Sequence, residues 1–138
     1  MASGCVVFRG CTLGFQHFRR TLGSVLFVLP ETDMHRARRW AEGKVPADLR
    51  NEIRMEIDTS PTALTIFECR PPWKFRESGA WTRSPIARLR YTQSKRSWTL
   101  YWCDQHEKFH RYEFVPPTQS LDRLLTEIDD DPTAIFWG

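Results

Sequence analysis

The chain has 138 residues, 41% of them hydrophobic and 27% charged, and its formal net charge is +3. These values fit one soluble globular domain of ordinary composition. The apolar segment GSVLFVLP at 23–30 is too short to span a membrane and lacks the cleavage pattern of a secretory signal. We therefore expect a cytoplasmic protein with reduced thiols and no membrane partner.

The first 29 residues do not share the regular pattern of the rest. They contain scattered apolar residues and four glycines, and no period is sustained. We expect residues 1–29 to be an N-terminal extension that is poorly ordered or that results from a start site assigned too early, with Val25, Val28 or Met34 as the true start. A genuine N-terminal strand or tail is the alternative. A single domain is expected over 30–138.

A helix and a short turn are predicted next. The segment ARRWA places apolar residues at i, i+3 and i+4, which predicts a helix from about 34 to 42. Thr32 or Asp33 can cap this helix, and Gly43 supplies the usual stop. A proline soon after it predicts a short turn over 46–51.

From Ile53 the hydrophobic period changes to two. The segments IRMEI and TALTIFEC alternate, and DTSP between them is a turn signal, which predicts a β-hairpin of 52–58 with 62–69. Three more alternating segments follow, IARLRYT, SWTLYWC and KFHRYEF, joined by the short turns QSKR and DQHE. Short turns imply antiparallel neighbours, and Pro116-Pro117 ends the last strand.

A helix before the C-terminus completes the predicted fold. Thr118 or Ser120 can cap it, Pro132 stops it, and its apolar face consists of Leu121, Leu124, Leu125 and Ile128. The tail TAIFWG is too apolar for a solvated terminus and is expected to pack on the core or on a sheet edge. The fold class is therefore α+β: a five-stranded antiparallel sheet, a hairpin plus a three-stranded meander, with an N-terminal and a C-terminal helix packed on one face.

Several sequence blocks resemble a known bacterial family over residues 29–138. They are RPPW at 70–73, ARLRYT at 87–92, WTLYW at 98–102, FHRY at 109–112, LLTEIDDDPT at 124–133 and the terminal IFWG. Together and in this order they resemble domain-of-unknown-function family 3024. The resemblance implies a small standalone bacterial protein, and it carries no activity, cofactor or catalytic residue to this chain.

One group of residues has ligand types that zinc prefers. Cys103, His106 and His110 form a C-x2-H-x3-H pattern, and Cys69 is a possible fourth ligand. A structural zinc site usually shows two compact pairs, and this spacing does not. Cys69 and Cys103 could also face each other across the sheet. We expect an ordinary hairpin here, with no metal and no cofactor.

The same hairpin contains candidate groups for acid–base catalysis. His106, His110 and Glu113 lie close to Arg111, and a small ribonuclease toxin could use a His or Glu as the general base with arginines stabilising the phosphate. Glu68 is more simply an ion-pair partner. The chain has no glycine-rich phosphate loop and no nucleophile elbow. The motifs thus favour a binding protein over an enzyme.

The basic middle of the chain is the main functional signal. Residues 70–111 contain ten Lys or Arg and three Asp or Glu, whereas 113–138 contains six acids and one arginine. If Leu89 faces the helices, alternation places Arg88, Arg90 and Ile86 in a row on the open face. Aromatics beside arginines on a sheet are typical of nucleic-acid binding. The candidate residues are Arg88, Arg90, Lys95, Arg96, Trp73, Trp81 and Arg83.

Other interpretations of these features remain open. The arginines could pair with the acids at 129–131, and the tryptophans could cover the core. We expect a binding or interaction protein with a basic sheet surface for nucleic acid or another anion. The alternatives are a phosphodiester-cleaving enzyme and a protein–protein module that uses the apolar IFWG tail.

Overall fold

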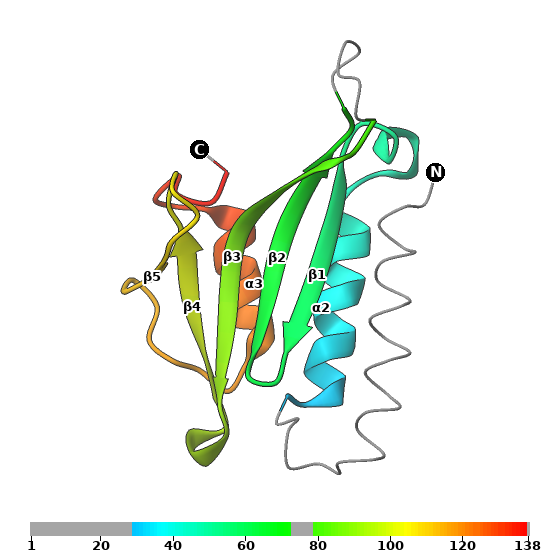
Figure 1. Ribbon diagram of the computed structural model, residues 1–138. Coiled ribbons are helices and arrows are strands. Elements are labelled where there is room, and N and C mark those ends of the chain that lie inside the picture. Colours follow the sequence, from blue (N-terminus) through cyan, green and yellow to red (C-terminus); the bar gives the residue numbers. More distant parts are fainter. Residues whose placement is uncertain (1–28, 73–78, 138) are drawn as a thin grey trace.

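A computed structural model describes residues 29–72 and 79–137, so most of the predicted extension, and Trp73, lie outside the described residues. The five strands form one antiparallel sheet in the order β1-β2-β3-β4-β5 (Figure 1). In chain order the helices and strands are α2 (Glu31–Lys44), a 3-10 turn (Ala47–Leu49), β1 (Arg54–Ser60), β2 (Ala63–Arg70), β3 (Thr82–Thr92), a 3-10 turn (Gln93–Lys95), β4 (Ser97–Cys103), β5 (Phe109–Arg111) and α3 (Leu121–Asp130). The predicted α+β meander with a helix before it and a helix after it is confirmed.

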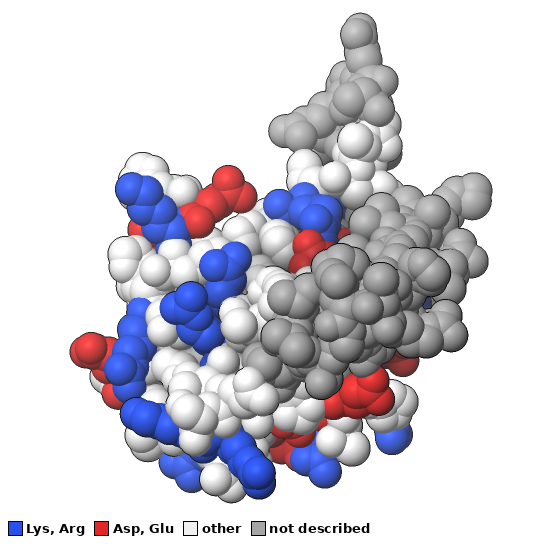
Figure 2. Space-filling model, turned by 60° about the horizontal axis from the view of Figure 1, so that its bottom comes forward, with Lys and Arg blue, Asp and Glu red and all other residues white. Residues whose placement is uncertain are grey.

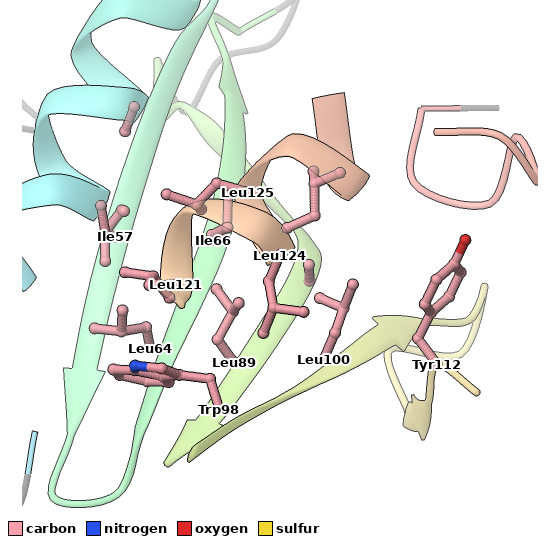
Figure 3. Packing of buried hydrophobic residues seen from close by; sticks show 14 of the residues in the cluster. Ile57, Leu64, Ile66, Leu89, Trp98, Leu100, Tyr112, Leu121, Leu124 and Leu125 are labelled. Carbon is pink, nitrogen blue, oxygen red and sulfur yellow. The ribbon is translucent and has the colours of Figure 1, made fainter. Parts of the chain in front are cut away.

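Both helices pack on the same face of the sheet (Figure 1). The core lies in this layer, where Leu64, Leu89 and Leu100 from three neighbouring strands project toward α3 (Figure 3). All three leucines are fully buried. Neither of the two described helices is long and apolar enough to cross a membrane. The opposite face of the sheet carries no described helix, and its side chains are those that can meet a ligand.

Helix α3 has the apolar face that its sequence predicts. Its buried residues are Leu121, Leu124, Leu125 and Ile128. Burial of a leucine or isoleucine side chain contributes about 1.5–3 kcal/mol, so this face holds the helix on the sheet. The chain reaches α3 through Thr118, whose backbone exchanges two hydrogen bonds with Trp98 of β4, at 2.7 and 3.0 Å. The Thr118 hydroxyl accepts the backbone N–H of Ser120 at 3.1 Å, and Ser120 is the N-cap residue.

Helix α2 is longer than predicted, and its predicted ends are wrong. It continues through Gly43 and stops before Val45, which is extended with φ −118° and ψ 118°. Val45 precedes a proline, and the proline ring disfavours helical geometry in the residue before it. At the start, Pro30 is the N-cap residue and no side chain caps the helix. Asp33 instead accepts a hydrogen bond from the Trp98 indole at 2.8 Å.

Two strands, β3 and β5, differ from the prediction in length, and one residue of β3 lies on the other face of the sheet. β3 begins at Thr82, earlier than expected, and β5 is limited to Phe109–Arg111. The register between β2 and β3 shifts at Ile66/Phe67, which leaves one β3 residue without a partner. Ile86, expected beside the arginines, packs against the core because of this shift.

The C-terminal tail packs on the core, as predicted. The Asp131 carboxylate accepts the backbone N–H groups of Ile135, Phe136 and Trp137 at 2.8–3.1 Å. Phe136 is only 6% exposed, and the Trp137 indole donates to the carbonyl of Ile128 at 2.7 Å. The tail is thus part of the fold, with Phe136 buried and Ile135 and Trp137 partly buried against the core.

Candidate anion-binding face of the sheet

Arg88 and Arg90 lie on the face of the sheet opposite the helices. Strand pairing places Arg88 between Thr65 and Tyr101, and Arg90 between Ala63 and Thr99. Residues directly opposite each other share a face, and successive residues alternate between faces. Because the neighbouring Leu89 is buried under the helices, both arginines point to the open side, as the alternation predicts.

Charge is divided between the two halves of this open face. On the β1 side, Arg83 is neutralised by Glu56 and Asp58 at 2.9 and 3.1 Å. Strands β3, β4 and β5 contain no acidic residue at all. They place Arg88 and Arg90 on the open face, and Arg111 joins them there because it pairs with Tyr101. Figure 2 shows lysines and arginines gathered over this side of the molecule with few carboxylates between them.

Arg88 is held in place by its neighbours. Its Nε donates to the Thr65 hydroxyl at 3.1 Å, and its guanidinium carbon lies 4.0 Å from the centroid of the Phe109 ring. Within the described residues neither Arg88 nor Arg90 forms an ion pair. The two terminal nitrogens of Arg88 are therefore available to bind an anion from a position that is already fixed.

A shallow hollow lies between these arginines. Its volume is about 380 Å³, within the range of small-molecule sites. It runs from the β1–β2 turn across β3 to β4 and β5, and its lining combines hydroxyls, two guanidinium groups and two aromatic rings. The lining residues are Ser60, Thr62, Ala63, Arg88, Arg90, Tyr101 and Phe109.

The β3–β4 turn extends the cationic surface. Lys95 ends the 3-10 turn and Arg96 follows it with φ 49°, and both side chains are exposed. The turn begins three residues after Arg90, at the same end of the sheet. Lys95 and Arg96, both predicted as binding residues, are therefore close in sequence to Arg90.

The remaining aromatic and basic candidates lie elsewhere. Arg83 precedes Arg88 by five residues, about 15 Å along an extended strand. Trp81 lies immediately before β3, where the guanidinium of Arg54 stacks on its ring at 3.9 Å. The structure therefore does not bring Trp81 and Arg83 together with Arg88 and Arg90.

The interpretation in which the acids at 129–131 neutralise Arg88 and Arg90 is wrong. Asp129 binds Lys44 at 2.6 Å and the Trp40 indole at 2.9 Å, and Asp131 binds the tail amides. These residues lie at the C-terminal end of α3, on the covered side of the sheet. Glu68, by contrast, forms the expected ion pair, with Arg70 at 2.9 Å.

The two histidines do not join the arginines in one site. His110 pairs with Trp102 across β4 and β5, and the two rings stack with centroids 4.7 Å apart. Because Trp102 packs against the core side, His110 lies on the opposite face from Arg88. His106 is exposed in the turn, and Glu113 is exposed beyond β5.

The candidate metal ligands do not converge either. In the part of the chain that the structure describes, no three Cys, His, Asp or Glu side chains are grouped closely enough to hold a metal ion. Both described cysteines are free, and β3 separates their strands. Burial, followed by the nearby Glu56, raises the pKa of the Cys69 thiol to about 12. Burial also raises the pKa of Cys103, so neither thiol is activated as a thiolate.

Asp104 organises the β4–β5 turn. Its carboxylate lies 2.7 Å from Nε2 of His110 and accepts the backbone N–H groups of His106 and Lys108 at 2.8 and 2.9 Å. The His110 hydrogen bond first, and then the Lys108 amide, lower the pKa of Asp104 to about 2. The turn therefore depends on an ionised carboxylate.

Replacing Asp104 with asparagine is expected to destabilise this hairpin at neutral pH. Because the folded-state pKa is below the ordinary value, the contribution of Asp104 is complete above about pH 4 and is lost as the pH falls toward 2. Asp104→Asn should therefore unfold at a lower temperature than wild type at pH 7, and the difference should shrink at pH 2–3. Glu113→Gln removes an exposed carboxylate near the turn and should show no such pH-dependent difference. Equal melting temperatures for Asp104→Asn and wild type at pH 7 would contradict this role.

Three residues around Arg88 were not predicted as site residues from the sequence: Tyr101 and Phe109 line the hollow, and Thr65 binds the Arg88 side chain. They reach the site through cross-strand pairing. Alternation in SWTLYWC separates Tyr101 from the core residues, so the pattern contained a signal for it. The pairing of Thr65 and Phe109 with their neighbours depends on register, which alternation does not specify.

Comparison with known proteins gives one match. The family described as "Domain of unknown function (DUF3024)" matches residues 27–138, which covers the whole described domain. No curated protein and no solved structure matches the chain significantly.

Proposed function

The chain belongs to the DUF3024 family, whose description assigns no activity, and we propose from the geometry of the sheet that it is a binding protein for nucleic acid. The backbone phosphates bind to the open face of β3, β4 and β5. The observation that supports this most directly is the set of three arginines on that face, Arg88, Arg90 and Arg111, in strands without a carboxylate.

The physical basis is the strength of arginine–phosphate contacts. A guanidinium group presents several N–H donors in a planar fork that matches two phosphate oxygens. Each such contact releases condensed counterions from the nucleic acid, so affinity falls as salt rises. Arg88 is fixed by Thr65 and Phe109, which reduces the conformational entropy that it loses on binding.

The placement of the histidines favours binding over cleavage of the phosphodiester bond. A general base must reach the attacking hydroxyl, within about 3 Å or through one water molecule. His110 lies on the other face and is engaged by Asp104 and Trp102. The strands that carry the arginines contain no acidic residue that could replace it as the base.

Replacing Arg88 and Arg90 together with alanine is expected to weaken oligonucleotide binding at least tenfold. The loss of two phosphate contacts should also reduce the slope of log K against log salt concentration by roughly 1.4 for a single strand. The measurement is fluorescence anisotropy of a labelled oligonucleotide over a range of salt concentrations.

A charge-matched control separates a local site from general electrostatic attraction. Arg39→Ala with Arg123→Ala removes two exposed arginines from the helices and should leave the affinity close to wild type. Unchanged affinity in the Arg88/Arg90 variant, or an equal loss in the control, would overturn the proposal. Time-dependent shortening of the oligonucleotide, abolished by His110→Ala, would establish the phosphodiester-cleaving alternative instead.

A further inference from the structure

The hollow on the open face combines cationic groups with an aromatic ring. Arg88 and Arg90 line it from β3, and Tyr101 lines it from β4. Tyr101 lies in the same cross-strand row as Arg88 and Arg111, so it has an arginine on either side. A flat ring flanked by guanidinium groups matches a ligand that has both a planar apolar part and anionic oxygens.

Tyr101 differs from the other aromatic residues that the structure describes. Each of the others has a ring or cation partner: Tyr91 contacts Trp98, Trp102 stacks with His110, and Phe109 lies under Arg88, for example. Across the described ranges, Tyr101 has no ring contact, no cation contact and no side-chain hydrogen bond in the protein, and it is half-buried at the hollow. Buried or half-buried tyrosines usually find a partner for both ring and hydroxyl, so this ring is available to a ligand.

We propose that the hollow holds one nucleotide unit of a single-stranded nucleic acid, with the base stacked on Tyr101 and the adjacent phosphate bound by Arg88 and Arg90. This assignment rests on the proposed function and specifies its ligand. A base can stack on a protein ring only if its own face is exposed, and the bases of a duplex are already stacked and paired. The hydroxyls of Ser60 and Thr62 at the rim are placed to contact the sugar or phosphate oxygens.

The shape of the domain also favours a single strand. Reading a duplex in its major groove requires an exposed helix or β-ribbon that can enter the groove. Both described helices pack on the sheet face opposite the hollow. The hollow itself is a shallow depression of about 380 Å³ in a sheet face, which suits a splayed base with its phosphate.

The test compares three probes of equal length: a labelled single strand of about ten nucleotides, the same strand annealed to its complement, and an abasic strand with the same phosphates. Wild-type protein should bind the single strand at least fivefold more tightly than the abasic strand, because stacking on one ring is worth that or more. The duplex should bind more weakly than the single strand. An abasic strand or a duplex bound as tightly as the normal single strand would overturn the inference.

A variant of Tyr101 isolates the ring. Tyr101→Leu keeps an apolar side chain of similar bulk on the strand, and its affinity for the single strand should fall at least fivefold to about that of the abasic strand. Tyr101→Phe should retain most of the affinity. Phe114→Leu removes an aromatic ring that is 74% exposed and outside the hollow, and it should have no effect. Equal single-strand affinity of Tyr101→Leu and wild type would overturn the inference.

Failure of this inference differs from failure of the proposed function. If the Arg88/Arg90 double variant weakens all three probes while Tyr101→Leu weakens none, the cationic surface stands and the nucleotide pocket does not. If wild-type protein binds none of the three probes at low salt, both fail. Circular dichroism of each variant should match wild type, and the abasic comparison on wild-type protein does not depend on any variant folding.

Discussion

Trp98→Ala is expected to lower the free energy of unfolding by about 3–5 kcal/mol, the range for removing a fully buried large aromatic side chain. Trp98 is completely buried, packs against Tyr91 with ring centroids 4.9 Å apart, and lies beside Leu64 in the core (Figure 3). Its indole also donates to Asp33 of α2, and its backbone pairs with Thr118 before α3. One residue of β4 therefore connects both helices to the sheet.

A second variant of Trp98 separates the effect of lost side-chain volume from the effect of the lost hydrogen bond. Trp98→Phe fills most of the space but leaves Asp33, whose side chain is 15% exposed, without the indole donor. Its expected cost is about 1.5–3 kcal/mol, the range for a hydrogen bond to a charged group. Urea denaturation with linear extrapolation measures both variants. A Trp98→Ala protein within about 1 kcal/mol of wild type would contradict this account.

Phe136→Ala is expected to destabilise the protein by about 3–4 kcal/mol, because Phe136 is 6% exposed and belongs to the core cluster. The loss should be visible as a lower midpoint of urea denaturation. This result would establish the tail as part of the folded core in solution.

Phe114 provides a matched control on the same neighbour. Both phenylalanines contact the ring of Tyr112, Phe114 at 5.3 Å and Phe136 at 5.1 Å between centroids, but Phe114 is 74% exposed. Phe114→Ala should therefore cost less than about 1 kcal/mol, as most exposed substitutions do. Equal losses for the two variants would show that burial in the tail does not determine stability. A stable Phe136→Ala protein that lost a binding partner would instead support the tail as an interaction segment.

The candidate site was only partly predictable from local sequence. Alternation in IARLRYT identified Arg88 and Arg90 as a pair on the face away from Leu89, and the absence of acids in the strands was visible as well. Alternation does not reveal which residues on other strands stand opposite them. Thr65, Tyr101 and Phe109 become members of the site only through the register of four strands.

Long-range ion pairs were the least predictable feature. The acids at 129–131 were candidates to neutralise the arginines because a helix C-terminus disfavours negative charge. In the fold, Lys44 and the Trp40 indole bind Asp129, and backbone amides of the tail bind Asp131. Arg83 pairs instead with Glu56 and Asp58 of β1. Net charge along the chain does not identify partners that are brought together from distant positions.

Local pattern by itself determined the elements of this protein, their order and most of the residues that form the core. A period of two or of 3.6 is a property of neighbouring residues, so the strands and the face of α3 can be read without knowing what they pack against. Only the tertiary structure decided which side chains meet. The bulge that turns Ile86 inward, the separation of His110 from Arg88 and the hollow beside Tyr101 all depend on contacts between segments distant in the sequence. Those contacts are set by strand register and by packing of the helices on one face, which no local period encodes.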